Sequence, residues 1–241
     1  MPFYDSTLPS EFQVYISTYT MDSFMSSLLE VHNIAFWVRS SMVPPTAPMS
    51  LTTTSLKTFL PGIESYYGAD VPVDLHIKVE TFGDITSSQS KQQLGGISTL
   101  TIEFWVETAS GEELATSMTL SNTSIAFTLL VSADMALTLN IGTVNVDKVV
   151  VNYCSFGKLN TLTLKVELNN FFRLFTPILN LKLAQHPIEL PTNFFIFTLS
   201  DVVIGYFDSY VYFGFTPTFV PPPFGTDGLP RPQAVEKFLS M

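Results

Sequence analysis

Apolar and polar residues alternate along most of the chain. In the segment VPVDLHIKVE (71–80), valine, leucine and isoleucine recur at every second position, mostly with polar or charged residues between them. A period of two is typical of strands with one buried and one solvated face, and it predicts long strands in an antiparallel, highly twisted sheet. Further segments that favour strands lie at residues 12–17, 100–107, 125–131, 135–141, 144–153, 193–204 and 208–215. Turns are expected at residues 83–96, 110–113, 132–134 and 141–143.

Two segments have the period of a helix instead. The first follows Thr20 and Asp22, either of which can cap a helix start, and its apolar residues predict about three turns. These residues are Met21, Phe24, Met25, Leu28 and Leu29. The second segment, 164–183, has an apolar face wider than that of a surface helix, so we expect other apolar groups to cover it. Pro177 lies inside it and predicts a kink or a break near Phe175. A shorter helical turn is expected within 55–67.

The order of these elements predicts the fold class. We expect an α+β fold in which a long, highly twisted antiparallel sheet wraps around two helices, with a single hydrophobic core, in one domain of residues 1–219. Hydrophobic residues make up 46% of the chain and charged residues only 13%, so a substantial core can form. Proline and glycine accumulate in residues 220–241, which predicts an extended tail outside the domain.

The charge of the chain argues against one class of partner. Eleven Lys and Arg against twenty-one Asp and Glu give a net charge of −10. This charge disfavours binding to nucleic acid, to anionic lipid headgroups and to lipopolysaccharide phosphates. The longest uncharged segment, 114–133, is interrupted by many Ser, Thr and Asn residues, so we expect no transmembrane span.

Residues that carry catalysis or bind metals are sparse. His32, His76 and His186 lack metal-ligand spacing, so no metal and no other cofactor is expected. The nucleophile pattern G-x-S-x-G is absent, since GGIST (95–99) lacks the closing glycine. Cys154 would need a distant histidine to act as a nucleophile, and a buried or strand-borne free thiol is the commoner explanation. The sequence therefore predicts that the protein is not an enzyme.

Several segments together resemble one known family. FQVYIS (12–17) with the helix after it, MVP (42–44) and LTTTSLKTFLP (51–61) resemble the start of the second barrel in the family of bactericidal/permeability-increasing protein, lipopolysaccharide-binding protein and cholesteryl ester transfer protein. TPILNLKLAQHPIELP (176–191) is similar to that family's kinked helix and Leu-Pro exit, and FTLSDVVIGYFDSYVYFGF (197–215) resembles its closing hairpin. The resemblance covers about residues 11–219. The glycine expected before the exit is replaced around His186 and Pro187, and the family's first barrel has no counterpart, so the chain resembles a detached carboxy-terminal half.

This resemblance implies both a fold and a function. It implies the super-roll barrel of the tubular lipid-binding superfamily, and the non-catalytic binding, with transfer as a further role, of a phospholipid or another fatty-acyl ligand in an apolar tube between sheet and helices. It also implies a missing amino-terminal barrel as partner and peripheral contact with a membrane. We expect the lipid-contacting residues on the apolar faces of the two helices, at Met25, Leu28, Leu29, Phe171, Phe172, Phe175 and Leu179.

The resemblance also implies an extracellular or endomembrane-lumenal location. The first residues, MPFYDSTLPSEF, lack the basic and apolar regions of a signal peptide, so a signal would have to lie upstream of them. The triplet Asn122-Thr123-Ser124 is an acceptor sequence for N-linked glycans and suits a secreted protein, although such triplets also occur by chance.

The residues alone leave a second interpretation open. The 21 Phe and 8 Met residues can line an adaptable cavity, but they can equally fill a solid core. A filled barrel would be a structural interaction module that binds a protein partner through its outer surface or its tail. The first interpretation predicts copurifying lipid, and the second predicts none.

Overall fold

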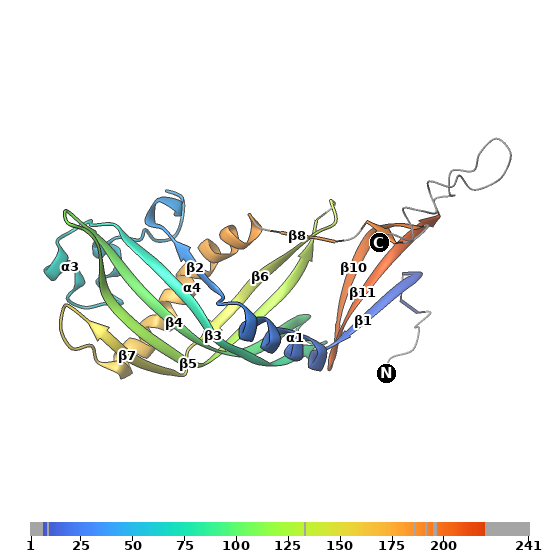
Figure 1. Ribbon diagram of the computed structural model, residues 1–241, viewed down its shortest axis with the longest axis horizontal. Helices are drawn as coiled ribbons and strands as arrows, with labels where there is room; N and C mark the ends of the chain where they lie inside the picture. The colour runs from blue at the N-terminus through green and yellow to red at the C-terminus, as the bar shows by residue number, and fades with distance from the viewer. Residues whose placement is uncertain are drawn as a thin grey trace.

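The computed structural model of the chain describes residues 7–219, apart from residues 9, 133, 186, 191, 195 and 196. This part is elongated, with a long curled antiparallel sheet toward one end and a smaller sheet at the other (Figure 1). The α+β fold built on a curled antiparallel sheet is as predicted. The predicted tail, residues 220–241, lies outside the described residues.

The larger sheet is antiparallel, and its first five strands pair with one another in the order of the sequence. Its order is β2 (Ala35–Val38), β3 (Val73–Ser88), β4 (Gln93–Thr108), β5 (Gly111–Val131), β6 (Ala136–Asn145) and β8 (Ile188–Glu189), and β7 (Lys148–Cys154) also pairs with β5. Buried and half-buried residues alternate along β4, as the period of two predicts. Three predicted turns were wrong in extent: β3 and β4 are joined at residues 89–92 rather than over 83–96, β4 and β5 are joined at 109–110 rather than over 110–113, and 141–143 continue β6.

The smaller sheet brings together the two ends of the domain. Its order is β1 (Phe12–Ser17), β11 (Tyr210–Phe219), β10 (Phe197–Phe207) and β9 (Asn193–Phe194). β1 pairs with β11 from Phe12 opposite Phe215 to Ser17 opposite Tyr210. This pairing holds the start of the domain against its final hairpin.

The first long helix, α1 (Thr18–Val31), begins directly after β1 and packs on β3. The Ser17 hydroxyl caps it by accepting a hydrogen bond from the Thr20 backbone N–H at 3.0 Å, so the predicted caps, Thr20 and Asp22, were wrong. Asp22 instead accepts a hydrogen bond at 3.0 Å from the backbone N–H of Ile85, where the pairing of β3 with β4 shifts register. Asp22 therefore anchors α1 to the sheet.

The second long helix, α4 (Thr161–Ala184), packs on β6 and β7 and is capped by the side chain of Asn160. It continues through Pro177, so the predicted alternative of a break was wrong. Phe175, Ile178 and Leu179, on both sides of the proline, are buried against the sheet. Because proline costs about 3 kcal/mol inside a helix, this burial can hold the helix together across it. The shorter helices are α2 (Thr53–Leu56), α3 (Ile63–Tyr67) and a 3-10 turn (Ser40–Met42).

The buried apolar residues form two clusters rather than the single predicted core. The larger one packs α4 and the short helices against β2–β7 and includes Leu75, Phe104 and Phe171. The second packs the smaller sheet against β3–β6 and includes Phe127 and Phe213. Apolar positions on one strand can serve different clusters, which the alternation alone does not reveal.

Candidate functional site

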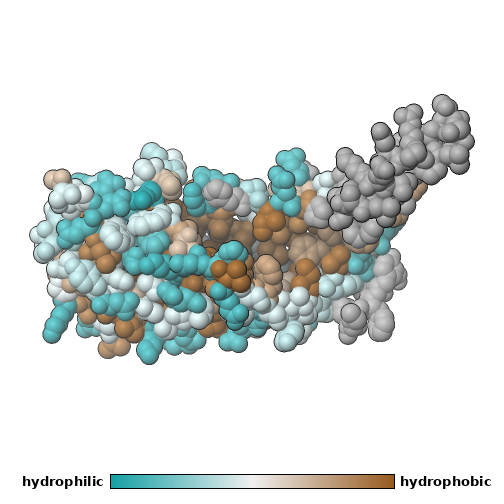
Figure 2. All heavy atoms as spheres, viewed as in Figure 1, coloured by the Kyte–Doolittle hydropathy of each residue, from teal (hydrophilic) through white to brown (hydrophobic). Residues whose placement is uncertain are grey.

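A hollow near the middle of the molecule is lined by hydrophobic side chains (Figure 2). In Figure 1, α1, β6 and β10 lie in this middle region of the molecule. Apolar residues from these elements and from β5 pack against the second cluster yet stay half-buried. We call those that pack against the second cluster alone the central hollow: Met21, Met25, Leu129, Leu137, Leu139, Val202 and Ile204.

The burial of the inner face changes along β5. Met118 and Leu120 have no exposed surface and belong to the larger cluster. Further along the same strand, Ile125 and Leu129 are only half-buried. Ile125 packs against both clusters, so this change coincides with the boundary between them.

The neighbouring strand shows the same incomplete burial. Ile141 of β6 pairs with Phe127 of β5, and Leu139 pairs with Leu129, so these side chains share one face of the sheet. Phe127 is buried, which identifies this face as the inner one. Ile141, Leu139 and Leu137 on β6 are nevertheless half-buried. The inner face is therefore partly open at the central hollow.

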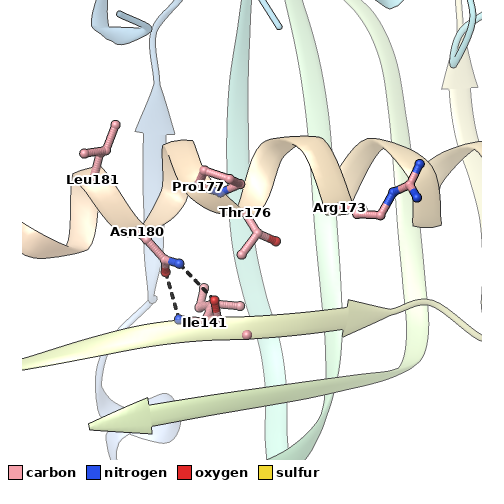
Figure 3. Close-up of a pocket in the computed structure, with 7 residues that line it drawn as sticks. Ile141, Arg173, Thr176, Pro177, Asn180 and Leu181 are labelled. Carbon is pink, nitrogen blue, oxygen red and sulfur yellow. Dashed lines mark hydrogen bonds between the residues drawn. The ribbon is translucent and has the colours of Figure 1, made fainter. Parts of the chain in front are cut away.

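Two asparagines of α4 bind the backbone of β6 and of the residue that follows it. Figure 3 shows the first contact, between Asn180 and Ile141. Asn180 accepts a hydrogen bond from the Ile141 N–H at 2.8 Å and donates one to the Ile141 carbonyl at 2.9 Å. Asn169 binds Val146 in the same way, at 2.7 and 3.2 Å. Eleven residues of helix, from Asn169 to Asn180, span about 16 Å. Five residues of extended chain also span about 16 Å, so the distance between the two amides matches the distance from Ile141 to Val146. The helix thereby covers the edge of β6 beyond its short pairing with β8.

A groove of about 600 Å³ lies between α4 and β6 at the Asn180 contact. Its volume falls within the range of small-molecule sites, about 300–1,000 Å³. Leu181 and Arg173 lie toward its two ends (Figure 3). The groove therefore offers apolar surface together with one cation. The residues that line it are Ile141, Gly142, Arg173, Thr176, Pro177, Asn180 and Leu181.

We expect the substitution Asn180→Ala to lower the free energy of unfolding by about 1–3 kcal/mol, because it leaves the Ile141 N–H and carbonyl without their side-chain partner. Urea unfolding followed by circular dichroism measures this change. The matched control is Asn170→Ala on the same helix, because Asn170 is half-buried and makes no side-chain hydrogen bond with the described residues. Equal losses in both variants would contradict a special role for the Asn180 contact.

Tyr206 joins the two sheets at the central hollow. The Leu129 backbone N–H donates to its hydroxyl at 2.7 Å, and the hydroxyl lies 3.4 Å from the Leu129 carbonyl. Only 6% of Tyr206 is exposed, and burial raises the pKa of its phenol. The neutral phenol thus fixes β10 against β5 beside the apolar side chains.

The predicted lipid-contacting residues fall into two groups in the structure. The four on α4 lie in the larger cluster, where the Phe171 and Phe175 rings stack at 4.9 Å and Phe171 also meets Phe104 and Phe59 edge-on. They are at most 6% exposed: Phe171, Phe172, Phe175 and Leu179. These three rings and Leu179 are therefore packed against other protein side chains.

The predicted residues on α1 are more accessible. Met25, Leu28 and Leu29 are all half-buried, and Met25 packs against the second cluster. Since α1 packs on β3 whereas α4 packs on β6 and β7, the structure does not gather the seven residues on one surface. Contact of these residues with lipid stays a prediction. The strand residues of the central hollow were not predicted as lipid contacts, because alternation marks inward positions without showing how completely each is covered.

One of the three histidines, His76, belongs to a charged cluster on the larger sheet. On β3 and β4, His76 and Lys78 bind the Glu103 carboxylate at 3.0 and 2.9 Å. Burial raises the pKa of Glu103, but the hydrogen bonds from Lys78, His76 and Trp105 outweigh it, so the pKa lies below its ordinary value. Cys154 is a half-buried free thiol at the end of β7. Among the described residues, no group of three or more His, Cys, Asp or Glu side chains is arranged to hold a metal ion.

Comparison with known families decides the classification of the chain. Its sequence matches the C-terminal domain of the LBP / BPI / CETP family over residues 8–216. The chain belongs to this family. That match covers the elements from β1 to β11, including both helices and the central hollow.

The solved structures include another protein that resembles this LBP / BPI / CETP domain. The crystal structure of lipopolysaccharide binding protein is 19% identical in sequence, with a TM-score of 0.46. The match covers 92% of this chain and 46% of that protein, so the chain spans about half of its length. No curated protein matches the chain. No helix among the described residues is long and apolar enough to cross a membrane.

Proposed function

We propose that the chain binds a phospholipid or another fatty-acyl lipid without catalysis, and that the acyl chains occupy the central hollow. The observation that carries this proposal is the half-buried inner face at Leu129, Leu137 and Leu139. Along β3, β4 and β5 the same sheet has inward residues with no exposed surface, such as Leu75, Ile102 and Met118. Membership of the LBP / BPI / CETP family, a family of lipid-binding and non-enzymatic proteins, supports the same function.

The two long helices, α1 and α4, have different roles in this binding. Met25, Leu28 and Leu29 of α1 contact the acyl chains beside the strand residues of the central hollow. The α4 side chains Phe171, Phe172, Phe175 and Leu179 form the packed wall that holds the sheet curled. We propose two partners for this function: a membrane, which the protein contacts peripherally, and an amino-terminal barrel. We also propose that the protein transfers the lipid and that it acts outside the cell or in the lumen of the endomembrane system.

The energetics of burial favour such binding. Removing one CH₂ group from water contributes about 0.8 kcal/mol, so an acyl chain of about sixteen carbons contributes on the order of 12 kcal/mol before ordering costs. Half of this value is enough for micromolar to millimolar affinity in a single-chain ligand. The net charge of −10 disfavours anionic headgroups, so zwitterionic lipids are the expected class.

Analysis of the purified full chain tests the proposal. We expect native mass spectrometry to show a lipid adduct, organic extraction to recover lipid in stoichiometric amount, and a fluorescent acyl probe to bind the extracted, refolded protein. Absence of both lipid and probe binding in a folded sample would overturn the proposal. That result would favour a filled interaction module instead.

A further inference from the structure

We infer that Asn122 is an acceptor for N-linked glycosylation, which rests on the proposed extracellular or lumenal route and not on lipid binding. Asn122-Thr123-Ser124 is the one N-x-S/T triplet of the sequence. A glycan is bulky, so the folded protein accommodates one only where the asparagine lies at the surface. The structure meets this requirement at Asn122.

Asn122 lies where β5 changes its pairing partner. β5 pairs with β7 as far as Ser121 and with β6 from Ser124 onward, and its register against β4 shifts at the same place. The φ angle of Asn122 is 54°, a left-handed conformation that asparagine adopts more readily than most residues. Its side chain is exposed, whereas the side chain of Thr123 has no exposed surface. The bulge therefore presents the Asn122 amide to solvent.

The hydrogen bond of this amide is compatible with a glycan. Asn122 Nδ2 donates to Asp147 Oδ2 at 3.1 Å, and Lys165 holds the other oxygen of the same carboxylate at 2.9 Å. A primary amide nitrogen carries two hydrogens, and glycosylation replaces one of them. The remaining N–H can still donate to Asp147. The folded structure around the bulge is thus preserved in the glycosylated chain.

The transfer step is a substitution at the first sugar carbon of a lipid-linked oligosaccharyl diphosphate. Asn122 Nδ2 forms a bond to C1 of that sugar, and the bond from C1 to the diphosphate oxygen breaks. The lipid diphosphate leaves with the electron pair of the broken bond. The proton that Nδ2 loses goes to a base of the transferase.

Expression of the full chain behind a cleavable signal peptide in eukaryotic cells tests this inference. We expect the secreted protein to migrate more slowly than the bacterially produced chain, and we expect peptide-N-glycosidase to remove the difference. The enzyme should leave an aspartate in the peptide that contains residue 122, which mass spectrometry detects. The variants Asn122→Gln and Ser124→Ala should lose the mobility shift completely, whereas the matched control Asn145→Gln, an exposed asparagine outside any triplet, should keep it.

Secretion of folded wild-type protein without a glycan would overturn the inference. A second version with an added acceptor triplet at its carboxyl terminus must carry a glycan, which verifies that the chain met the transferase. A shift that persists in both Asn122→Gln and Ser124→Ala would also overturn it. Because lipid extraction is measured on the bacterially produced chain, failure of this inference and failure of lipid binding are distinguishable.

Discussion

The substitution Phe175→Ala is expected to lower the free energy of unfolding by about 3–5 kcal/mol. Phe175 has no exposed surface and stacks on Phe171 at a centroid distance of 4.9 Å. Removal of its ring deletes buried apolar surface and leaves a cavity in the larger cluster. Since Thr176 and Pro177 follow it directly, the shortened side chain also removes packing next to the missing backbone hydrogen bond of the proline.

Urea unfolding followed by circular dichroism measures this loss. The matched control is Leu162→Ala at the start of α4, where 79% of the side chain is exposed, and we expect it to change stability by less than about 0.5 kcal/mol. A loss below about 1 kcal/mol in Phe175→Ala, together with loss of acyl-probe binding, would contradict the assignment of Phe175 to a packed wall. It would place lipid against α4 instead.

Local periodicity was sufficient to predict most of the strands and both long helices. Residues 71–80 and 100–107 alternate because one face of β3 and β4 is buried, and each strand carries that signal in its own sequence. The helix at 164–183 was equally clear, and its wide apolar face matches the burial of Leu164, Leu168 and Phe172. The actual α4 extends three residues further toward Thr161, because Asn160 provides the cap.

Features that depend on distant contacts were not predictable. The change of partner from β7 to β6 along β5 coincides with the boundary between the two clusters, and nothing within residues 111–131 specifies that change. The turn predicted at 141–143 fails because Asn180, far away in sequence, fixes the backbone of Ile141 within β6. Asn169 and Asn180 are eleven residues apart, which is three helical turns, and this spacing was the one available signal for the edge contact.

The candidate site was predicted only in part, for the same reason. Met25 is both a predicted contact and a member of the central hollow, since its helical period marks the face that turns toward the sheet. Leu137 and Leu139 lie within 135–141, a segment that the sequence predicts to be a strand. Both pack against the second cluster, to which α4 contributes no residue, and both stay half-buried. A sequence pattern reports which side of a strand faces inward, but not the distance to whatever lies opposite.

The substitution Leu139→Trp is expected to weaken binding of an acyl probe at least about tenfold, equivalent to 1.4 kcal/mol or more, while the fold stays intact. Leu139 lies opposite Leu129 on the inner face of β6 and β5, and both side chains are half-buried in the central hollow. An indole at this position would occupy the space that we assign to an acyl chain. Competition for that space, rather than loss of folding, is the reason for the expected effect.

Stability and binding measured together distinguish an open hollow from a packed core. A larger side chain forced into a filled core costs typically 1–3 kcal/mol, whereas one that enters open apolar space costs little or adds buried surface. We therefore expect Leu139→Trp to change the free energy of unfolding of lipid-free protein by less than about 1 kcal/mol. The control is Leu130→Trp on β5, where 52% of the side chain is exposed; we expect this variant to bind the probe normally. Marked destabilisation of Leu139→Trp, with wild-type probe binding in the fraction that stays folded, would mean that protein side chains fill the central hollow and that the lipid lies elsewhere.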